Sequence, residues 1–267
     1  MQTGRENSIQ RPAAWFQNGF HRFLAPFLKR HFHAVAIENS HRPEQNIPED
    51  ASLVVYANHP SWWDPLIAHF LNRSLFPDRQ FYAPIDAEAL QQYRVFEKLG
   101  FFGVQLDTRS GAAEFLSRSR EILSGNDTAL WITPEGRFAD VRDHQAELQP
   151  GLSHLCSKSE TLVALPVALE YVFWEERLPV CLVALGAAQM VAEAPERSKA
   201  EWNCHLTRAL REAQTRLADR SIARDSNGFE NLLRGNRGTG GVYESIRRFK
   251  AFVTGRSFKA AHGEHFE

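Results

Sequence analysis

The chain of 267 residues is predicted to fold as an α/β protein around a central, largely parallel sheet. Apolar runs of strand length alternate with segments of helical periodicity between residues 33 and 185, the pattern of successive βαβ units. Hydrophobic residues make up 43% of the chain, enough for a sizeable core. No clean linker or internal repeat divides the sequence, so we expect helices to flank one sheet and further helices to lie at both ends.

The expected elements follow from apolar runs, helical periodicity and capping signals. Strands are expected at 33–38, 52–57, 79–83, 102–106, 128–133, 161–169 and 178–185, with helices at 62–73, 86–98, 110–123 and 151–158. The helix at 110–123 has the clearest limits, with Ser110 as its cap and Ser124-Gly125 as its stop. A long charged helix is predicted over about 196–225, with Pro195 at its start.

The N-terminal segment has the spacing of an amphipathic helix over residues 13–31. Phe16, Phe20, Phe23 and Phe27 fall on one narrow stripe. Pro26 should kink or divide this helix, because it removes a backbone donor and crowds the preceding turn. The segment could be an interfacial membrane anchor or a helix packed on its own core.

Basic residues concentrate at the two ends of the chain. Residues 1–33 carry a net charge of +4 and residues 232–260 carry +6, whereas the whole chain carries −1. We therefore expect the termini to meet an anionic surface. The loop at 234–241 could be a phosphate nest or a flexible turn, and the predicted basic helix at 242–253 could hold anionic headgroups or be a solvated face.

Composition argues against several other classes of protein. No apolar run approaches the ~20 residues of a membrane-spanning helix, and residues 1–10 lack the apolar core of a signal peptide. Cys156, Cys181 and Cys204 have no ligand-like spacing, so we expect reduced thiols in a cytoplasmic protein and no metal site. We expect no nucleic-acid partner.

The strongest chemical signal is the segment 58–64, Asn-His-Pro-Ser-Trp-Trp-Asp, which follows the apolar run 53–56. His59 could take a proton from a hydroxyl near neutral pH, because a free histidine titrates near 6.5. Asp64, five positions later, could fix the tautomer and stabilise the imidazolium. Ser61 lacks the surrounding G-x-S-x-G of a nucleophile elbow, so the attacking hydroxyl is expected to belong to the substrate. Alternatively, His59 caps a helix that begins near Pro60, and Asp64 is a first-turn carboxylate.

Three further blocks follow in a fixed order. Gly103 to Arg109 reads G-V-Q-L-D-T-R, Pro134 to Arg137 reads P-E-G-R, and Leu165 to Glu170 reads L-P-V-A-L-E. With the H-x-x-x-x-D of His59 and Asp64, these blocks resemble the glycerolipid acyltransferase family, typified by lysophosphatidic acid acyltransferases. The resemblance covers roughly residues 50–185.

The resemblance implies an O-acyltransferase that moves a fatty acyl group from acyl-CoA or acyl-carrier protein to a lipid hydroxyl, without a metal or another cofactor. His59 would be the general base and Asp64 its orienting partner. Asn58 and Ser61 would support the turn. The first acceptor it suggests is a lysophospholipid such as 1-acylglycerol-3-phosphate.

The same resemblance assigns substrate-binding roles. Glu135 and Gly136 would shape the acceptor pocket, and Arg137 and Arg109 would bind an acceptor phosphate by a bidentate fork. Pro166 would line the acyl or thioester channel. The alternatives are surface salt bridges for the arginines, for example with Asp140 or Asp107, and a strand-end proline for Pro166.

The chain departs from the family pattern at two phosphate contacts. Arg137 follows Gly136 directly, without the usual threonine, and Asp107 is separated from Arg109 by Thr108. The segment 83–86 ends in an acid where a basic residue is common. Acylation of another polar lipid or a glycolipid is therefore an open alternative. A thioesterase or lipid hydrolase that uses the same histidine and a non-catalytic lipid-binding scaffold are the others.

The predicted layout has three parts. Residues 1–33 form an amphipathic segment that contacts the membrane, 34–190 the acyltransferase core, and 191–267 a helical extension packed on or near that core. The need to reach lipid favours membrane contact for the first segment. We expect a cytoplasmic protein on the inner face of the membrane.

Overall fold

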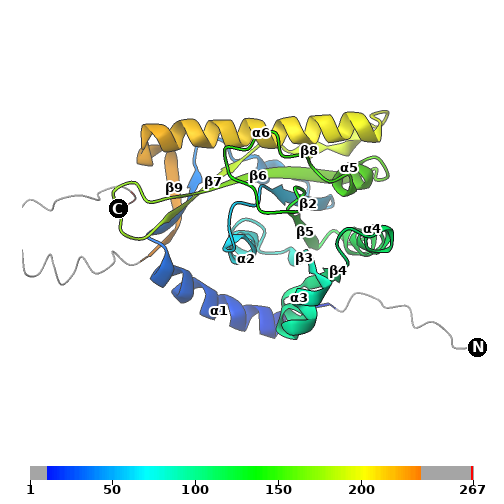
Figure 1. Cartoon of the computed structure of the whole chain (residues 1–267), viewed down its shortest axis with the longest axis horizontal. Helices are drawn as coiled ribbons and strands as arrows, with labels where there is room; N and C mark the ends of the chain where they lie inside the picture. Colours follow the sequence, from blue (N-terminus) through cyan, green and yellow to red (C-terminus); the bar gives the residue numbers. More distant parts are fainter. Residues whose placement is uncertain (1–10, 236–265, 267) are drawn as a thin grey trace, which may run out of the picture.

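The computed structural model describes residues 11–235 and 266. Its centre is one mixed, mostly parallel sheet of nine strands flanked by helices, which confirms the predicted α/β class (Figure 1). The glycine-rich loop and the basic helix predicted near the C-terminus lie outside the described residues, apart from Arg234 and Gly235. Residues 1–10 lie outside them as well.

The strands are β1 (Ala34–Glu38), β2 (Ser52–Ala57), β3 (Gln80–Asp86), β4 (Phe101–Val104), β5 (Thr128–Ile132), β6 (Leu162–Val172), β7 (Val180–Leu185), β8 (Gln189–Met190) and β9 (Phe229–Arg234). Their order is β4-β3-β5-β2-β6-β7-β1-β9, with β8 paired to β6. From β4 to β6 all neighbours are parallel. The carboxyl ends of these five strands therefore meet at one edge, where such sheets place their ligand sites.

The α-helices are α1 (Ala14–His31), α2 (Asp64–Leu75), α3 (Ala87–Gln92), α4 (Arg109–Leu123), α5 (Gly151–Cys156) and α6 (Lys199–Ala223). Short 3₁₀ helices lie at η1 (Pro43–Asn46), η2 (Arg94–Leu99), η3 (Val191–Glu193) and η4 (Ser226–Gly228).

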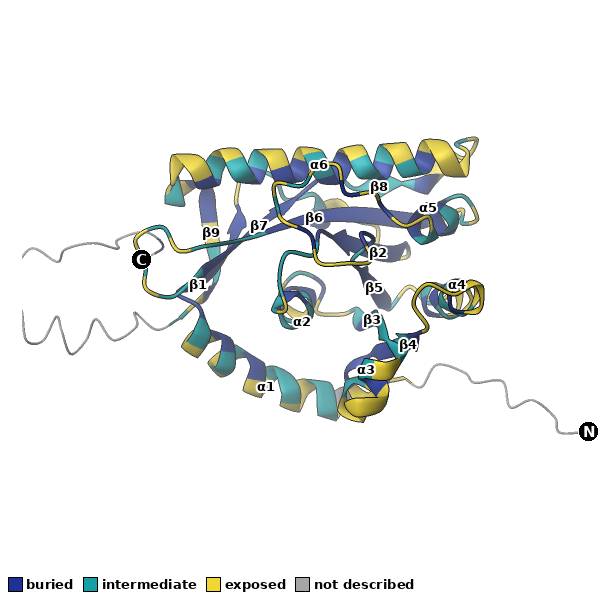
Figure 2. Ribbon diagram, in the orientation of Figure 1, coloured by how far each residue is buried: buried dark blue, intermediate teal, exposed yellow. Residues whose placement is uncertain are grey.

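The helices cover both faces of the sheet, so strands β1, β2, β5 and β7 are buried along their length (Figure 2). Leu53 and Val55 of β2 face a core shared with α1, α2 and α3, whereas Val54 and Tyr56 face the core under α4, α5 and α6. Successive side chains alternate between the two cores, as the pleat of a strand requires. Figure 1 shows α6 along one side of the sheet, with α1 and α2 on the other.

The N-terminal segment is one continuous helix, α1, which runs through Pro26. Leu24 and Leu28 are buried in the core, whereas Trp15 and Phe23 are 76% and 59% exposed. One side of α1 thus packs on the core of the protein, as the interpretation of a packed helix predicts. Large aromatic groups remain exposed on its outer side. None of the helices within residues 11–235 has both the length and the apolar character needed to cross a membrane.

Other details also differ from the sequence prediction. The single helix expected over 86–98 is divided into α3 and the 3₁₀ helix η2. Helix α4 is capped by Thr108, whose hydroxyl accepts the Gly111 N–H at 3.0 Å, so it begins one residue before the expected Ser110 cap. Helix α6 begins at Lys199, after a capping box of Ser198 and Glu201, and not near Pro195. Strand β9, which pairs antiparallel with β1, was not predicted because only Phe229 and Leu233 of its six residues are buried.

Candidate active site

The turn after β2 brings His59 and Asp64 together. Their side chains form a 2.6 Å contact between His59 Nδ1 and Asp64 Oδ2. Because an ionised carboxylate only accepts hydrogen bonds, the Nδ1–H donates and Nε2 keeps its lone pair. The His59 side chain is 18% exposed and the Asp64 side chain 3%. The imidazole thus has a buried carboxylate behind it and some access to solvent.

The helix-cap interpretation of His59 does not match this geometry. Helix α2 begins at Asp64 and has Trp63 at its cap position, without a side-chain capping bond. The other interpretation of Asp64 does hold alongside the pairing, since its carboxylate lies in the first turn of α2 and accepts the Ser61 N–H at 3.0 Å.

The turn itself is fixed by Asn58 and Ser61. The Asn58 side chain makes two bonds with the backbone of Leu169 in β6: its amide donates to the carbonyl at 3.0 Å, and its oxygen accepts the N–H at 2.8 Å. Ser61 Oγ accepts the Trp63 N–H at 3.2 Å. The Asn58 contacts join the segment before α2 to β6, and the Ser61 contact stabilises the turn, as expected for residues that support the turn.

Tyr171 is a third group at the pair, and sequence reasoning missed it. Its hydroxyl donates to Asp64 Oδ1 at 2.6 Å. Burial, aided by the nearby Cys181 and Asp64, holds the pKa of Tyr171 well above its ordinary value, so the phenol keeps its proton. The available signal was a tyrosine at the carboxyl end of the apolar run of β6, at the same sheet edge as His59.

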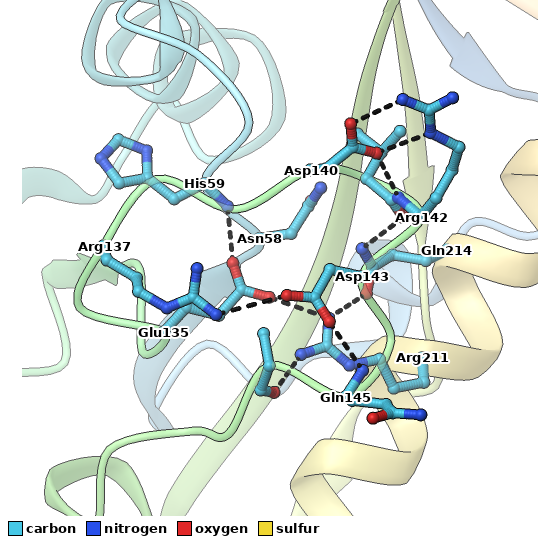
Figure 3. Close-up of polar contacts among 12 residues, drawn as sticks. Asn58, His59, Glu135, Arg137, Asp140, Arg142, Asp143, Gln145, Arg211 and Gln214 are labelled. Carbon is cyan, nitrogen blue, oxygen red and sulfur yellow. Dashed lines mark hydrogen bonds and ion pairs between the residues drawn. The ribbon is translucent and has the colours of Figure 1, made fainter.

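Glu135 lies beneath His59 and is almost fully enclosed, with 1% of its side chain exposed (Figure 3). One carboxylate oxygen accepts the backbone N–H of His59 at 3.1 Å, and the other accepts from Arg211 Nη1 at 2.8 Å. The same guanidinium donates to Gln214 and to the backbone carbonyl of Ala146. Glu135 was predicted in the acceptor pocket; in this structure it reaches the site through the backbone of His59.

Arg211 is the second residue that sequence reasoning missed. It lies in α6, a helix with many exposed charged residues, and the sequence does not distinguish it from them although its side chain is only 11% exposed. Its pairing with Glu135 joins α6 to the loop after β5, across 76 residues of sequence. Both partners are needed together, because removal of either one would leave the other as an uncompensated buried charge.

The residues after Glu135 shape the rim. Gly136 has φ +67°, a conformation that favours glycine, and its backbone lies close to Gln149. Arg137 is 59% exposed and pairs with Asp143 at 3.3 Å, so its partner is not the Asp140 considered above, which pairs with Arg142 (Figure 3). The Phe138 ring contacts the His59 ring, with centroids 4.3 Å apart and planes tilted by 31°.

Two predicted residues lie away from this cluster. Arg109 is exposed at the start of α4, after β4, and β3 and β5 separate that strand from β2. Three strand spacings of ~4.8 Å place its backbone roughly 14 Å along the sheet edge from the His59 turn. Pro166 lies within β6, on the same face as Ala164 and Ala168, which contact the cores under α6. It is therefore not at a strand end, and its predicted role in the channel stays a prediction.

A pocket of about 630 Å³ opens on the α6 side of this site. Pro60 and Tyr171 lie in its wall, together with the loop at 140–144 and the end of α6. One of these wall residues, Tyr171, donates its hydroxyl to the Asp64 carboxylate.

The fold and site define an α/β protein with a histidine–carboxylate pair at the carboxyl edge of a parallel sheet. The family model described as Acyltransferase matches residues 39–170, a span that contains His59, Asp64 and Glu135. Residues 39–170, just under half of the chain, belong to this acyltransferase family, which confirms the resemblance and supports acyl transfer in lipid metabolism. A search of curated proteins finds no match.

Proposed function

We propose that the protein transfers a fatty acyl group from acyl-CoA or acyl-carrier protein to the hydroxyl of a polar lipid. The 2.6 Å contact of His59 Nδ1 with the Asp64 carboxylate carries this proposal, because it leaves Nε2 free to accept a proton. The match of residues 39–170 to the acyltransferase family gives the reaction class.

The proposed step needs no acyl-enzyme. His59 Nε2 takes the proton of the acceptor hydroxyl while the hydroxyl oxygen attacks the thioester carbonyl carbon. The tetrahedral intermediate collapses, the C–S bond breaks, and the thiolate leaves as the sulfur takes the proton from the imidazolium. Asp64 stabilises the imidazolium in between, as the carboxylate of a triad does. The products are the ester and the free thiol.

A lysophospholipid such as 1-acylglycerol-3-phosphate is the first acceptor to test. Arg137 could bind its phosphate, because its pairing with Asp143 is exposed and such pairs contribute about 0–1 kcal/mol. The altered spacing after Gly136 and the distance of Arg109 from His59 weaken phosphate recognition. We therefore propose a different polar lipid or a glycolipid as the alternative acceptor.

We also propose that the protein works at the cytoplasmic surface of a membrane. Trp62, three residues after His59, and Phe138, whose ring contacts the His59 ring, are 69% and 58% exposed. Trp15 and Phe23 of α1 are exposed as well. Aromatic groups of this kind favour the headgroup region, where the lipid hydroxyl lies.

The test is to incubate purified protein with a total polar-lipid extract and isotope-labelled acyl-CoA or acyl-carrier protein, and to identify labelled lipids by mass spectrometry. A labelled ester whose formation requires the protein is the expected result, and its structure names the acceptor. Release of free acid at the same rate without lipid would assign a hydrolase. A stable acyl-serine in quenched samples would contradict direct attack.

A further inference from the structure

We infer that Tyr171 is a positioning residue that sets the basicity of His59 through the Asp64 carboxylate. The role rests on the proposed use of His59 as a general base. Tyr171 lies in the wall of the adjacent pocket, and its hydroxyl donates to the Asp64 carboxylate on which the His59 ring depends.

The two oxygens of Asp64 are divided between different partners. Oδ2 accepts from His59 Nδ1 at 2.6 Å and from the Ser61 N–H at 3.0 Å, and Oδ1 accepts from the Tyr171 hydroxyl at 2.6 Å. Asp64 begins α2, whereas Tyr171 lies 107 residues later in β6. Tyr171 therefore fixes the rotation of the Asp64 carboxylate from strand β6, whereas His59 and Ser61 belong to the turn before α2.

Tyr171 is held ready to donate. It pairs in register with Cys181 of β7, a thiol with no exposed surface, and contacts the Phe32 ring at 5.9 Å between centroids. Burial raises the pKa values of both the phenol and the thiol, so both groups keep their protons at neutral pH. Because the phenol keeps its proton, it donates a hydrogen bond to Asp64 and stabilises the ionised form of that carboxylate.

The charges around His59 leave Asp64 as its main ionic partner. Other titratable groups near the turn are Glu135, Arg137, Arg211, Tyr171 and Cys181. Asp140, Arg142, His144 and Glu170 line the pocket together with Pro60 and Tyr171. Glu135 is paired with Arg211, Arg137 with Asp143 and Asp140 with Arg142, so each of these charges has an opposite charge beside it. The negative charge at the Asp64 oxygens therefore determines how strongly the imidazolium is favoured.

A hydrogen bond to Oδ1 draws charge away from the side of the carboxylate that faces the ring. Loss of the phenol should return that charge to Oδ2, favour the imidazolium and raise the pKa of His59. A shift of about 0.5–1 unit is expected for one charge-assisted hydrogen bond. Since a general base acts in its neutral form, the acidic limb of the pH–rate profile should move up by the same amount.

The first experiment compares Tyr171→Phe with Tyr56→Phe. Tyr56 is the matched control, because it is a buried tyrosine whose hydroxyl donates to the Leu206 carbonyl at 3.1 Å on the opposite face of the sheet. The pKa of His59 is read from ¹H–¹⁵N spectra of histidine-labelled protein, with His59→Gln to assign the signal. Tyr171→Phe should raise the pKa and Tyr56→Phe should not.

A second variant covers the case in which Tyr171→Phe folds poorly. Replacement of Tyr171 by 3-fluorotyrosine keeps the ring and makes the hydroxyl a stronger donor, so the pKa of His59 should fall below that of the unmodified protein. An unchanged pKa in both variants would overturn the inference, including the case in which water from the adjacent pocket replaces the hydroxyl.

The spectra do not depend on turnover, which separates this inference from the proposed function. If His59→Gln keeps full activity while Tyr171→Phe still shifts the His59 titration, the coupling stands and the general-base assignment fails. If the His59 titration does not move in Tyr171→Phe but His59→Gln is inactive, the general-base assignment stands and the coupling to Tyr171 fails.

Discussion

Two histidines ten residues apart illustrate how position decides what an imidazole can do. His59 follows the carboxyl end of β2, is partly exposed, and donates to a carboxylate. His69 lies within α2, is 1% exposed, and donates through Nε2 to the Leu99 carbonyl at 3.2 Å. Its ring packs against Phe81 and His21, with centroids 4.4 and 4.7 Å away.

The two environments favour opposite charge states. Burial lowers the pKa of His69 to about 3, and burial with the nearby Arg73 lowers that of His21 to about 4. Both rings are neutral at pH 7 and serve as packing groups between α1 and α2. Of these three histidines, His59 is the one with a carboxylate, that of Asp64, in contact with its ring, and it is the general base in the proposed function.

The largest expected effect is on the chemical step. His59→Gln should lower kcat/KM by roughly 10²–10⁴, the usual contribution of a general base, because glutamine cannot take the proton. The midpoint of thermal unfolding should hardly change, since the ring is partly exposed and packs against an exposed Phe138. Steady-state rates and calorimetry of the same preparation measure both quantities, and retained activity would remove the distinction between the two histidines.

His69→Ala should have the complementary effect. It opens a cavity among Phe20, His21 and Phe81, and large-to-small changes in a core cost roughly 2–5 kcal/mol of unfolding free energy. Urea denaturation measures that loss. Activity per folded molecule should stay within a factor of about two of the unmodified protein, as expected for a packing residue remote from the chemistry. A loss as deep as that of His59→Gln would break the comparison.

Acid should separate the histidines further. Because the pKa of His69 is lowered in the folded state, unfolded chains bind its proton first as the pH falls below about 6.5. The stability that depends on a neutral His69 is therefore complete above pH 6.5 and is lost as the pH falls toward 3. His69→Gln, which keeps a donor near Leu99, should flatten the fall in unfolding free energy between pH 6.5 and 4. If the unfolding free energy of His69→Gln falls as steeply as that of the unmodified protein, groups other than His69 cause the fall.

The sequence was sufficient for the fold class and for the groups that lie within one segment. His59, Asp64, Asn58 and Ser61 all belong to one turn, and the hydrogen bonds among them span at most five residues. Strand β2 ends in this turn and leaves a local pattern in the sequence, because a continuous apolar run is followed directly by turn residues.

The partners that complete the site could not be found in this way. Tyr171 reaches Asp64 across 107 residues and Arg211 reaches Glu135 across 76, and the sheet order that brings them together is set by the whole fold. Arg211 also looks like any other charge of a long polar helix. Strand β9 was missed because its mixed pattern acquires meaning only when it pairs with β1.

The smallest expected effect concerns α1, which joins the buried histidines to the surface. Its His21 packs on His69, while Trp15 and Phe23 are exposed. If these aromatics enter a bilayer surface, Phe23→Ser should weaken binding to anionic liposomes by about 10- to 100-fold, given ~1.5–3 kcal/mol for one buried aromatic group. Ile222→Ser is the matched control, because Ile222 is 81% exposed on α6, on the other side of the sheet. Flotation assays measure the binding, and equal losses for both surfaces would show that α1 is no different from any exposed apolar surface of the protein.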